Sequence, residues 1–228
     1  MINAFIIAKG HSDRVPNKHF RTFGNQQLIS HSIHMLKQVS NIDQIILDSD
    51  DDHLLKLGER CGAIPMKRKE GLNTNETTAD DLIYEQAKTK WAKDCDYLVQ
   101  ISPCTPFLQD TTVDMAIHHI LKTKATSLAL CRSEKLHSWG GMVSGVLKLQ
   151  NYHRNGRLLN SQELMSIEYE TTGLYVTTKS DVLKHHRRLD PYDTVFLEAN
   201  KYEAVDINTE EDWEFAETLW KGFHASTE

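Results

Sequence analysis

The feature that most constrains the fold is the alternation of short apolar runs with segments of helical spacing. Apolar runs occupy residues 4–8, 44–47, 97–101 and 127–131, and a polar loop and then a helical pattern follow each of the first three. Short apolar runs of this kind are typical of strands buried on both faces, and their alternation with helices favours parallel strands joined by right-handed crossovers. We therefore predict an α/β fold with a doubly wound, mostly parallel sheet.

The predicted helices occupy residues 28–39, 54–61, 78–91 and 113–121. Gly62 follows the second of these at the usual position of a left-handed C-cap, and a short strand is expected at 63–66. In such sheets, ligands bind beyond the carboxyl ends of the strands. The loops in which a site is expected are therefore 9–19, 48–52, 102–110 and 132–139.

The pattern changes between residues 132 and 170. Residues 143–149 alternate like a half-exposed strand, and Asn155-Gly156 is a hairpin signal. We interpret residues 132–170 as an antiparallel excursion that serves as a substrate lid, a dimer arm or both. No linker rich in Pro, Gly or Ser interrupts the chain, so residues 1–228 are predicted to form a single domain.

The last part of the chain is predicted to return to the sheet. Strands are expected at 173–176 and 204–207, and helices at 180–187 and 210–222. Thr209 is the predicted N-cap of the final helix, with an acidic residue three positions on, close to a capping box.

Composition excludes several classes of function. The 228 residues carry a formal net charge of −6, which disfavours a nucleic-acid partner. No apolar run approaches the roughly 20 residues that a membrane span needs, so no membrane partner is expected. The four cysteines form no C-x-x-C pair, and no secretion signal is apparent. We therefore expect reduced thiols and a cytoplasmic protein.

The loop at residues 9–18 combines three cations, Lys9, Arg14 and Lys18. Phosphate groups need cationic partners and backbone N–H donors, and this loop can supply both. Its low glycine content excludes a P-loop or a G-x-G-x-x-G turn. The alternative is a solvated basic loop, and composition alone does not separate the two interpretations.

Two acidic segments are candidates for binding a metal. For residues 48–52 we favour an N-cap with an acidic first helical turn over a metal site. Asp206 precedes the predicted cap of the last helix, so capping explains it less well, and a carboxylate at a strand end is a plausible Mg²⁺ ligand. No nucleophile elbow is present, which disfavours covalent catalysis.

The first loop resembles the opening motif of the acylneuraminate cytidylyltransferase family, A-R-x-x-S-K-x-L-P-x-K-N. Ser12, Pro16 and Lys18 match this motif, while Lys9 replaces the family arginine and His19 the asparagine. The family activates sialic acids and related sugar acids as CMP conjugates.

The resemblance continues in order along nearly the whole chain. Residues 48–51 resemble the family's S-T-D-D, and Arg68 matches its arginine before the third helix. Residues 102–107 resemble Q-P-T-S-P-L, residues 172–175 resemble N-G-A-I-Y, and residues 206–213 resemble D-I-D with its acidic helix start. The resemblance implies a Rossmann-like nucleotidyltransferase fold.

The sequence also departs from the family pattern. Asn208 replaces the second metal-binding aspartate, and its carbonyl oxygen can still bind a metal, although without charge. Residues 161–165 lack the arginine that holds the substrate acid in the family. The acceptor is therefore expected to be a sialic-acid-like sugar acid, another 2-keto sugar acid or a phosphonate.

The resemblance implies transfer of CMP from CTP to a small acidic acceptor, with Mg²⁺ or another divalent metal as cofactor and release of pyrophosphate. It implies a homodimer, with residues 132–170 supplying acceptor contacts. Lys9, Lys18 and Asp206 are the implied catalytic residues, and Asp206 and Asn208 the implied metal ligands. The implied nucleotide-binding residues are Ala8, Lys9, Gly10, Ser12, Arg14, Lys18, Arg68, Ser102, Cys104 and Thr105.

Two alternatives remain. The replacements at Asn208 and His19 are also compatible with a CTP-binding protein that has lost catalysis. A sugar-1-phosphate nucleotidyltransferase would have the same fold, but such enzymes open with a glycine-rich loop, and here Gly10 is the single glycine before the basic cluster.

Overall fold

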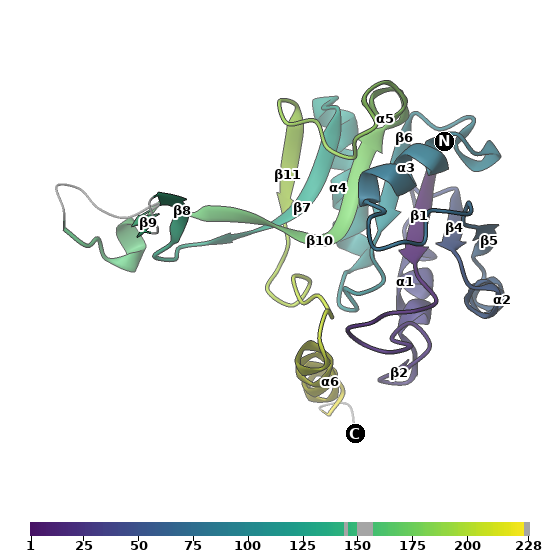
Figure 1. Cartoon of the computed structure of the whole chain (residues 1–228), viewed down its shortest axis with the longest axis horizontal. Helices are drawn as coiled ribbons and strands as arrows, with labels where there is room; N and C mark the ends of the chain where they lie inside the picture. The colour runs from purple at the N-terminus through teal and green to yellow at the C-terminus, as the bar shows by residue number, and fades with distance from the viewer. Residues whose placement is uncertain (144–145, 150–156, 226–228) are drawn as a thin grey trace.

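The computed structural model describes residues 1–143, 146–149 and 157–225. Its main sheet has seven strands in the order β11-β7-β10-β6-β1-β4-β5 (Figure 1). These are β1 (Ile2–Ala8), β4 (Gln44–Ser49), β5 (Ile64–Lys67), β6 (Tyr97–Ile101), β7 (Ser127–Glu134), β10 (Ile167–Thr178) and β11 (Thr194–Glu198).

The direction of the strands confirms the predicted doubly wound, mostly parallel sheet. β1 pairs in parallel with β4 and β6, β4 with β5, and β7 with β11. β10 runs antiparallel to both its neighbours, β6 and β7. Among the described residues, β10 is thus the one strand of this sheet that runs against the others, and it lies next to β6, after which the predicted ligand loop 102–110 begins.

Helices cover both faces of the sheet because alternate residues of the buried strands point to opposite sides. One core joins Ala4 and Ile6 of β1 to α1 (Leu28–Leu36), α2 (Asp52–Cys61) and α4 (Asp110–Thr123). A second core joins Phe5 to α3 (Ala79–Ala87) and α5 (Lys179–His185). A third, smaller core lies under α6 (Glu210–His224) and includes Phe23, which ends β2 (Thr22–Phe23), a short strand paired with β3 (Gln26–Gln27).

The predicted helix ends are confirmed where capping residues mark them. Gly62 ends α2 in the left-handed conformation, with φ of 101°. Thr78 and Thr209 start α3 and α6 with complete capping boxes. Asp51 caps α2 by accepting a hydrogen bond from the amide of Leu54, so the capping interpretation of the 48–52 segment is confirmed. Each such cap contributes about 1 kcal/mol to stability.

An arm projects from the sheet (Figure 1). The distal parts of β7 and β10 form its antiparallel stem, and β8 (Trp139–Val143) and β9 (Val146–Leu149) pair beyond this stem. The arm also contains a short 3₁₀ helix at Ser161–Glu163. Another 3₁₀ helix, Lys90–Ala92, follows α3 in the body of the fold. The antiparallel excursion is thus confirmed, although Asn155-Gly156 lies outside the described residues.

The predicted strand at 204–207 is wrong. Residues 201–204 form a turn, and the following segment is irregular, because the amide of Ile207 donates to the carbonyl of Cys104 at 2.9 Å, in the loop after β6. The sheet instead ends at β11, whose residues are only half-buried or exposed. Among the described residues, no helix is long and apolar enough to cross a membrane.

Candidate active site

A cavity of about 560 Å³ opens at the carboxyl ends of β1 and β6. Its wall comes from the loop after β1, the loop after β6, the middle of β10 and the segment before α6. Eight of the twelve predicted site residues line it: Lys9, Ser12, Arg14, Lys18, Ser102, Cys104, Asp206 and Asn208. The site thus lies where the topology of a doubly wound sheet places ligands.

The cations of this cavity bind neutral oxygens. Lys9 donates to the carbonyl of Thr74 at 2.8 Å, and Lys18, which is buried, donates to the carbonyl of Ile207 at 2.9 Å. Arg14 donates to Oδ1 of Asn208 at 2.8 Å.

A fourth cation, Arg188, donates to Oε1 of Gln100 at 3.2 Å. Among the described residues, none of these four side chains forms an ion pair with a carboxylate, whereas Arg21, Arg68, Arg132 and Arg187 each do. The cavity therefore keeps positive charge available for an anionic ligand.

Asp206 is held at the centre of the site by two hydrogen bonds to one of its carboxylate oxygens. Thr172 donates to Oδ2 from its hydroxyl at 2.8 Å, and Asn208 donates from Nδ2 at 2.6 Å. The other oxygen, Oδ1, is buried and has no hydrogen-bond partner. A buried carboxylate oxygen without a partner fits a divalent cation, and Mg²⁺ is commonly held by one or two carboxylates together with phosphate oxygens and water.

Asn208 lies between Arg14 and Asp206 in this arrangement. Its Oδ1 accepts from Arg14 and its Nδ2 donates to Asp206, so the amide aligns the carboxylate and a cation. Its predicted metal-binding role would use the second lone pair of this oxygen or replace its bond from Arg14. Within the described part of the chain, no cluster of three or more His, Cys, Asp or Glu side chains is placed to hold a metal.

Gly10 supports the first loop. Its amide donates to Oδ1 of Asp50 at 2.9 Å, and a Cβ at this position would lie 2.3 Å from Cβ of Asp51. Glycine is required here because the backbone of the first loop approaches the loop after β4 so closely. Gly10 and Ala8 are not among the residues that line the cavity.

Arg68 lies behind the first loop and is buried. Its Nε donates to Oδ1 of Asp48 at 2.9 Å, and its Nη2 donates to the carbonyl oxygens of Asp48 and Ala8 at 2.9 and 3.3 Å. Gln86 donates to the other carboxylate oxygen of Asp48 at 2.6 Å. Arg68 therefore ties the ends of β1, β4 and β5 together and is not among the lining residues. Its predicted nucleotide contact stays a prediction.

Thr105 also lies outside the lining. It is buried, and its hydroxyl donates to the carbonyl of Ser102 at 3.1 Å, closing the turn after β6. Gly173 of β10 passes directly over it, because a Cβ on Gly173 would lie 2.8 Å from Oγ1 of Thr105. This contact sets the distance between two walls of the cavity.

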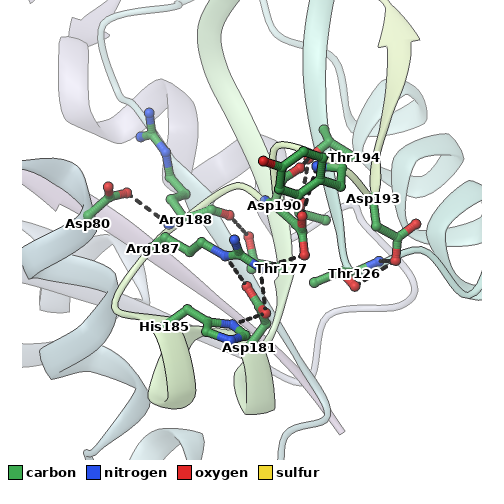
Figure 2. A network of polar contacts seen from close by, with 12 residues as sticks. Asp80, Thr126, Thr177, Asp181, His185, Arg187, Arg188, Asp190, Asp193 and Thr194 are labelled. Carbon is green, nitrogen blue, oxygen red and sulfur yellow. Dashed lines mark hydrogen bonds and ion pairs between the residues drawn. The ribbon is translucent and has the colours of Figure 1, made fainter.

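Sequence reasoning missed seven lining residues: Ile7, His11, Asp13, His19, Asn75, Thr172 and Arg188. His19 and Thr172 stood inside the motifs that carried the resemblance, so position in the motif was a usable signal. Arg188 carried no such signal, because it lies after α5, outside every motif, and only the folding of the chain brings it next to the cavity. Figure 2 shows its guanidinium group extending away from the polar network around Asp181.

His19 is buried beside two cations. Burial, and then the nearby charges of Lys18 and Arg68, lower its pKa from 6.5 to about 3. Its Nδ1 has no hydrogen-bond partner in the described structure. His19 is therefore a neutral polar group at physiological pH.

Two curated bacterial proteins are similar to this chain over nearly their whole length. A pseudaminic acid cytidylyltransferase from Campylobacter jejuni is 23% identical over 234 residues, covering 99% of each chain. A CMP-N,N'-diacetyllegionaminic acid synthase from Legionella pneumophila is 26% identical over 235 residues, covering 96% of this chain and 95% of the other.

Solved structures show the same fold. A CMP:2-keto-3-deoxy-manno-octonic acid synthetase in complex with CTP superposes with a TM-score of 0.68 at 15% identity, over 97% of this chain and 98% of the other. A 4-diphosphocytidyl-2C-methyl-D-erythritol synthase from Anaerococcus prevotii superposes with a TM-score of 0.66 at 13% identity, over 96% of each.

The family assignment follows from the sequence profile. The family model described as cytidylyltransferase matches residues 4–216, which include every predicted site residue. The match covers most of the chain and agrees with the resemblance of the six motifs. The chain therefore belongs to the cytidylyltransferase family, and it is a CTP-dependent nucleotidyltransferase.

Proposed function

We propose that the protein transfers CMP from CTP to a 2-keto sugar acid in a Mg²⁺-dependent reaction and releases pyrophosphate. The observation that carries this proposal is the set of four cavity cations, Lys9, Arg14, Lys18 and Arg188, whose side chains donate to neutral oxygens and form no ion pair within the described part of the chain. A triphosphate and an acidic acceptor bring several negative charges into one cavity, and a site with unpaired cations suits both.

Three of the cations lie on one loop and suit the triphosphate. Lys9, Arg14 and Lys18 all line the cavity. Transfer at a phosphate needs charge neutralisation and in-line positioning of the reactants, and it does not need a protein nucleophile. Ser102 and Cys104, in the loop after β6, also line the cavity, and backbone groups of this loop would contact the base. Arg68 supports this loop from behind through the carbonyl of Ala8.

Asp206 would hold the Mg²⁺ ion through Oδ1, with the phosphate oxygens and water as further ligands. When bound, the ion would supply charge neutralisation at the phosphates. Thr172 and Asn208 hold the carboxylate so that Oδ1 is oriented before any ligand arrives. Preorganisation of this kind saves the free energy that reorganisation would cost during the reaction.

The sugar-acid acceptor is supported by the relatives. The names of the two bacterial relatives refer to pseudaminic and legionaminic acids, and that of the CTP-bound structure refers to a 2-keto-3-deoxy sugar acid. Transfer to a phosphonate stays an alternative acceptor reaction. Retention of CTP binding without turnover would instead support a protein that has lost catalysis.

The arm is proposed to form a homodimer interface within a single-domain cytoplasmic enzyme. Large apolar side chains are exposed along it, including Leu158 at 73% and Met165 at 77%. Exposed apolar surface of this kind marks interaction sites. We expect a dimer by light scattering of the full chain. Leu158→Asp should shift the mass towards the monomer, and an unchanged mass would contradict the assignment of this surface.

The main test is pyrophosphate release by the purified chain with Mg²⁺. CTP, UTP, ATP and GTP are each combined with pseudaminic, legionaminic, N-acylneuraminic and 2-keto-3-deoxy-manno-octonic acids, and with a phosphonate and a sugar-1-phosphate. The proposal predicts release with CTP and a sugar acid only. Release with the phosphonate alone, or with another nucleotide, would overturn the acceptor or the base assignment.

Asp206→Asn tests the metal assignment. The variant should lose most of its turnover at saturating CTP, because the neutral amide is a weaker Mg²⁺ ligand. Asp114→Asn, on α4 and bonded to Ser40 and Asn41, is the matched control and should keep wild-type turnover. Normal turnover of Asp206→Asn with Mg²⁺ would refute the metal site.

A further inference from the structure

We infer that Arg188 binds the carboxylate of the sugar-acid acceptor, an inference that rests on the proposed function. Arg188 lines the same cavity as Asp206 and Thr172. It reaches the cavity from the segment after α5, not from the first loop, so it stands apart from the three cations assigned to the triphosphate.

The guanidinium group of Arg188 is held in one orientation. Its central carbon lies 3.4 Å from the centroid of the Tyr175 ring, and its Nη1 donates to Oε1 of Gln100 at 3.2 Å. Its backbone is fixed as well, since its amide donates to Oδ1 of Asp80 at 2.8 Å and its carbonyl accepts from Thr177 (Figure 2). A stacked, fixed guanidinium binds a planar anion with little loss of conformational entropy.

Gln100 cannot turn its amide group without breaking a buried network. Its Nε2 donates to Oε1 of Gln86 at 3.2 Å, and Nε2 of Gln86 donates to the Asp48 carboxylate at 2.6 Å. Arg68 donates to the same carboxylate. The network therefore keeps Oε1 of Gln100 facing Arg188.

Arg188 retains free donors, in contrast to its neighbour. Arg187 donates to Asp181 at 2.8 and 3.0 Å and also to Asp190, and it does not line the cavity. The guanidinium group of Arg188 forms no ion pair with a carboxylate among the described residues, and its Nε and Nη2 make no hydrogen bond there. The two adjacent arginines thus differ in role, one neutralised within the fold and one facing the cavity with donors suited to a carboxylate.

The position of Arg188 beside β10 favours the acceptor over CTP. Tyr175, under the guanidinium, and Thr172, which holds Asp206, are on the same strand. The charges of Arg188 and Asp206 also act in opposite directions on the pKa of the Tyr175 phenol, which burial raises most. Both charges therefore act on one ring, and the proposed acceptor would place its reacting oxygen near Asp206 and its carboxylate at Arg188.

The experiment compares a sugar acid with its own primary amide. Using the acid that wild-type protein converts fastest, Arg188→Gln should raise the KM for the acid about 10- to 100-fold and leave the KM for CTP within about 3-fold. Wild-type protein should disfavour the amide by a similar factor, and Arg188→Gln should not distinguish acid from amide. Arg188→Lys should lie between them, because it keeps the charge and loses the planar fork. Arg187→Lys is the control and should leave both KM values unchanged.

Each other outcome has a defined meaning. The assignment would be overturned if Arg188→Gln or Arg188→Lys preferred the acid over the amide by the same factor as wild-type protein. A selective rise in the KM for CTP would also overturn it and give Arg188 to the triphosphate. No CMP conjugate from wild-type protein with any acid would refute the proposed function itself, and the Arg188 assignment with it.

Discussion

Thr172 adopts a left-handed backbone conformation, with φ of 59°, and in it donates a 2.8 Å hydrogen bond from its hydroxyl to Oδ2 of Asp206. A β-branched residue rarely occupies this region because its side chain crowds its own backbone. Such strain costs of order 1–3 kcal/mol and persists where the surrounding structure enforces it, often at active sites. Here it aims one hydroxyl at the carboxylate proposed to hold the metal.

Replacing Thr172 should separate stability from activity. Thr172→Gly removes the strain, so the free energy of unfolding should stay the same or rise by about 1 kcal/mol. Turnover should fall about 10-fold, because Asp206 loses an oriented donor. Urea denaturation and pyrophosphate release at saturating CTP measure the two quantities. Thr172→Ser keeps the hydroxyl and should keep turnover within a few-fold, while full activity of Thr172→Gly would show that the hydrogen bond is dispensable.

Replacing Arg68 should lower the free energy of unfolding more than it weakens CTP binding. Arg68→Met leaves the buried carboxylate of Asp48 without its cation, so the free energy of unfolding should fall by about 3–5 kcal/mol in urea denaturation. Adding Asp48→Asn should recover part of this loss, because it removes the unpaired charge. Arg60→Met, on the exposed side of α2, is the control and should change stability by less than about 0.5 kcal/mol.

A different result would restore the role expected from the sequence. If Arg68→Met folded with near-normal stability and raised the KM for CTP alone, Arg68 would contact the nucleotide. The structure favours the positioning role because Arg68 is buried, does not line the cavity, and donates from Nε and Nη2 to Asp48 and to the carbonyl of Ala8.

Most of the fold followed from local sequence signals. The central strands were predictable because they are continuous apolar runs, and β6 coincides with its predicted range, 97–101. The strand expected at 204–207 was not, because Val205 and Ile207 face a small core under α6 and not the sheet. Two alternating apolar residues in a sequence do not indicate which of several cores they will pack into. β11 escaped prediction because an edge strand with half-exposed residues carries no strong periodicity.

The candidate site was predictable where residues follow one another along the chain. The loop after β1 supplied Lys9, Arg14 and Lys18 from a single segment. Arg188 was not found, because its function depends on stacking against Tyr175 and on a network that crosses the sheet. Arg68 could be matched to a motif, but the sequence did not reveal that a carboxylate neutralises it inside the fold.

Adding one methyl group at Gly173 should test its close contact with Thr105 through the free energy of unfolding. In Gly173→Ala, the new Cβ would lie 2.8 Å from Oγ1 and 3.2 Å from Cγ2 of the buried Thr105, so the free energy of unfolding should fall by about 1–3 kcal/mol. In a Thr105→Ala background the same change should cost much less, giving a clear non-additivity. Gly222→Ala has nothing within 4 Å of the new Cβ and should stabilise α6 by up to about 1 kcal/mol. Additive losses would mean that the two walls are not in contact.

The pH dependence of stability should contain a distinct contribution from His19. Its pKa is about 3 in the folded chain and 6.5 as the ordinary value, so below pH 6.5 the unfolded chain binds a proton that the folded chain does not. Protonation therefore favours unfolding between pH 6.5 and about 3, and this group makes stability rise with pH across that window. Above pH 6.5 neither state is protonated, and the contribution is constant.

Urea denaturation between pH 5 and 8 measures this contribution by comparing wild-type protein with His19→Asn. The wild-type free energy of unfolding should drop by about 2 kcal/mol more than that of the variant between pH 6.5 and 5, since each pH unit contributes up to about 1.4 kcal/mol. His53→Asn, which removes an exposed histidine of α2, is the matched control. Parallel curves for wild-type protein and His19→Asn would show that His19 takes up a proton inside the fold, and the burial that keeps a neutral group beside Lys18 would then be incomplete.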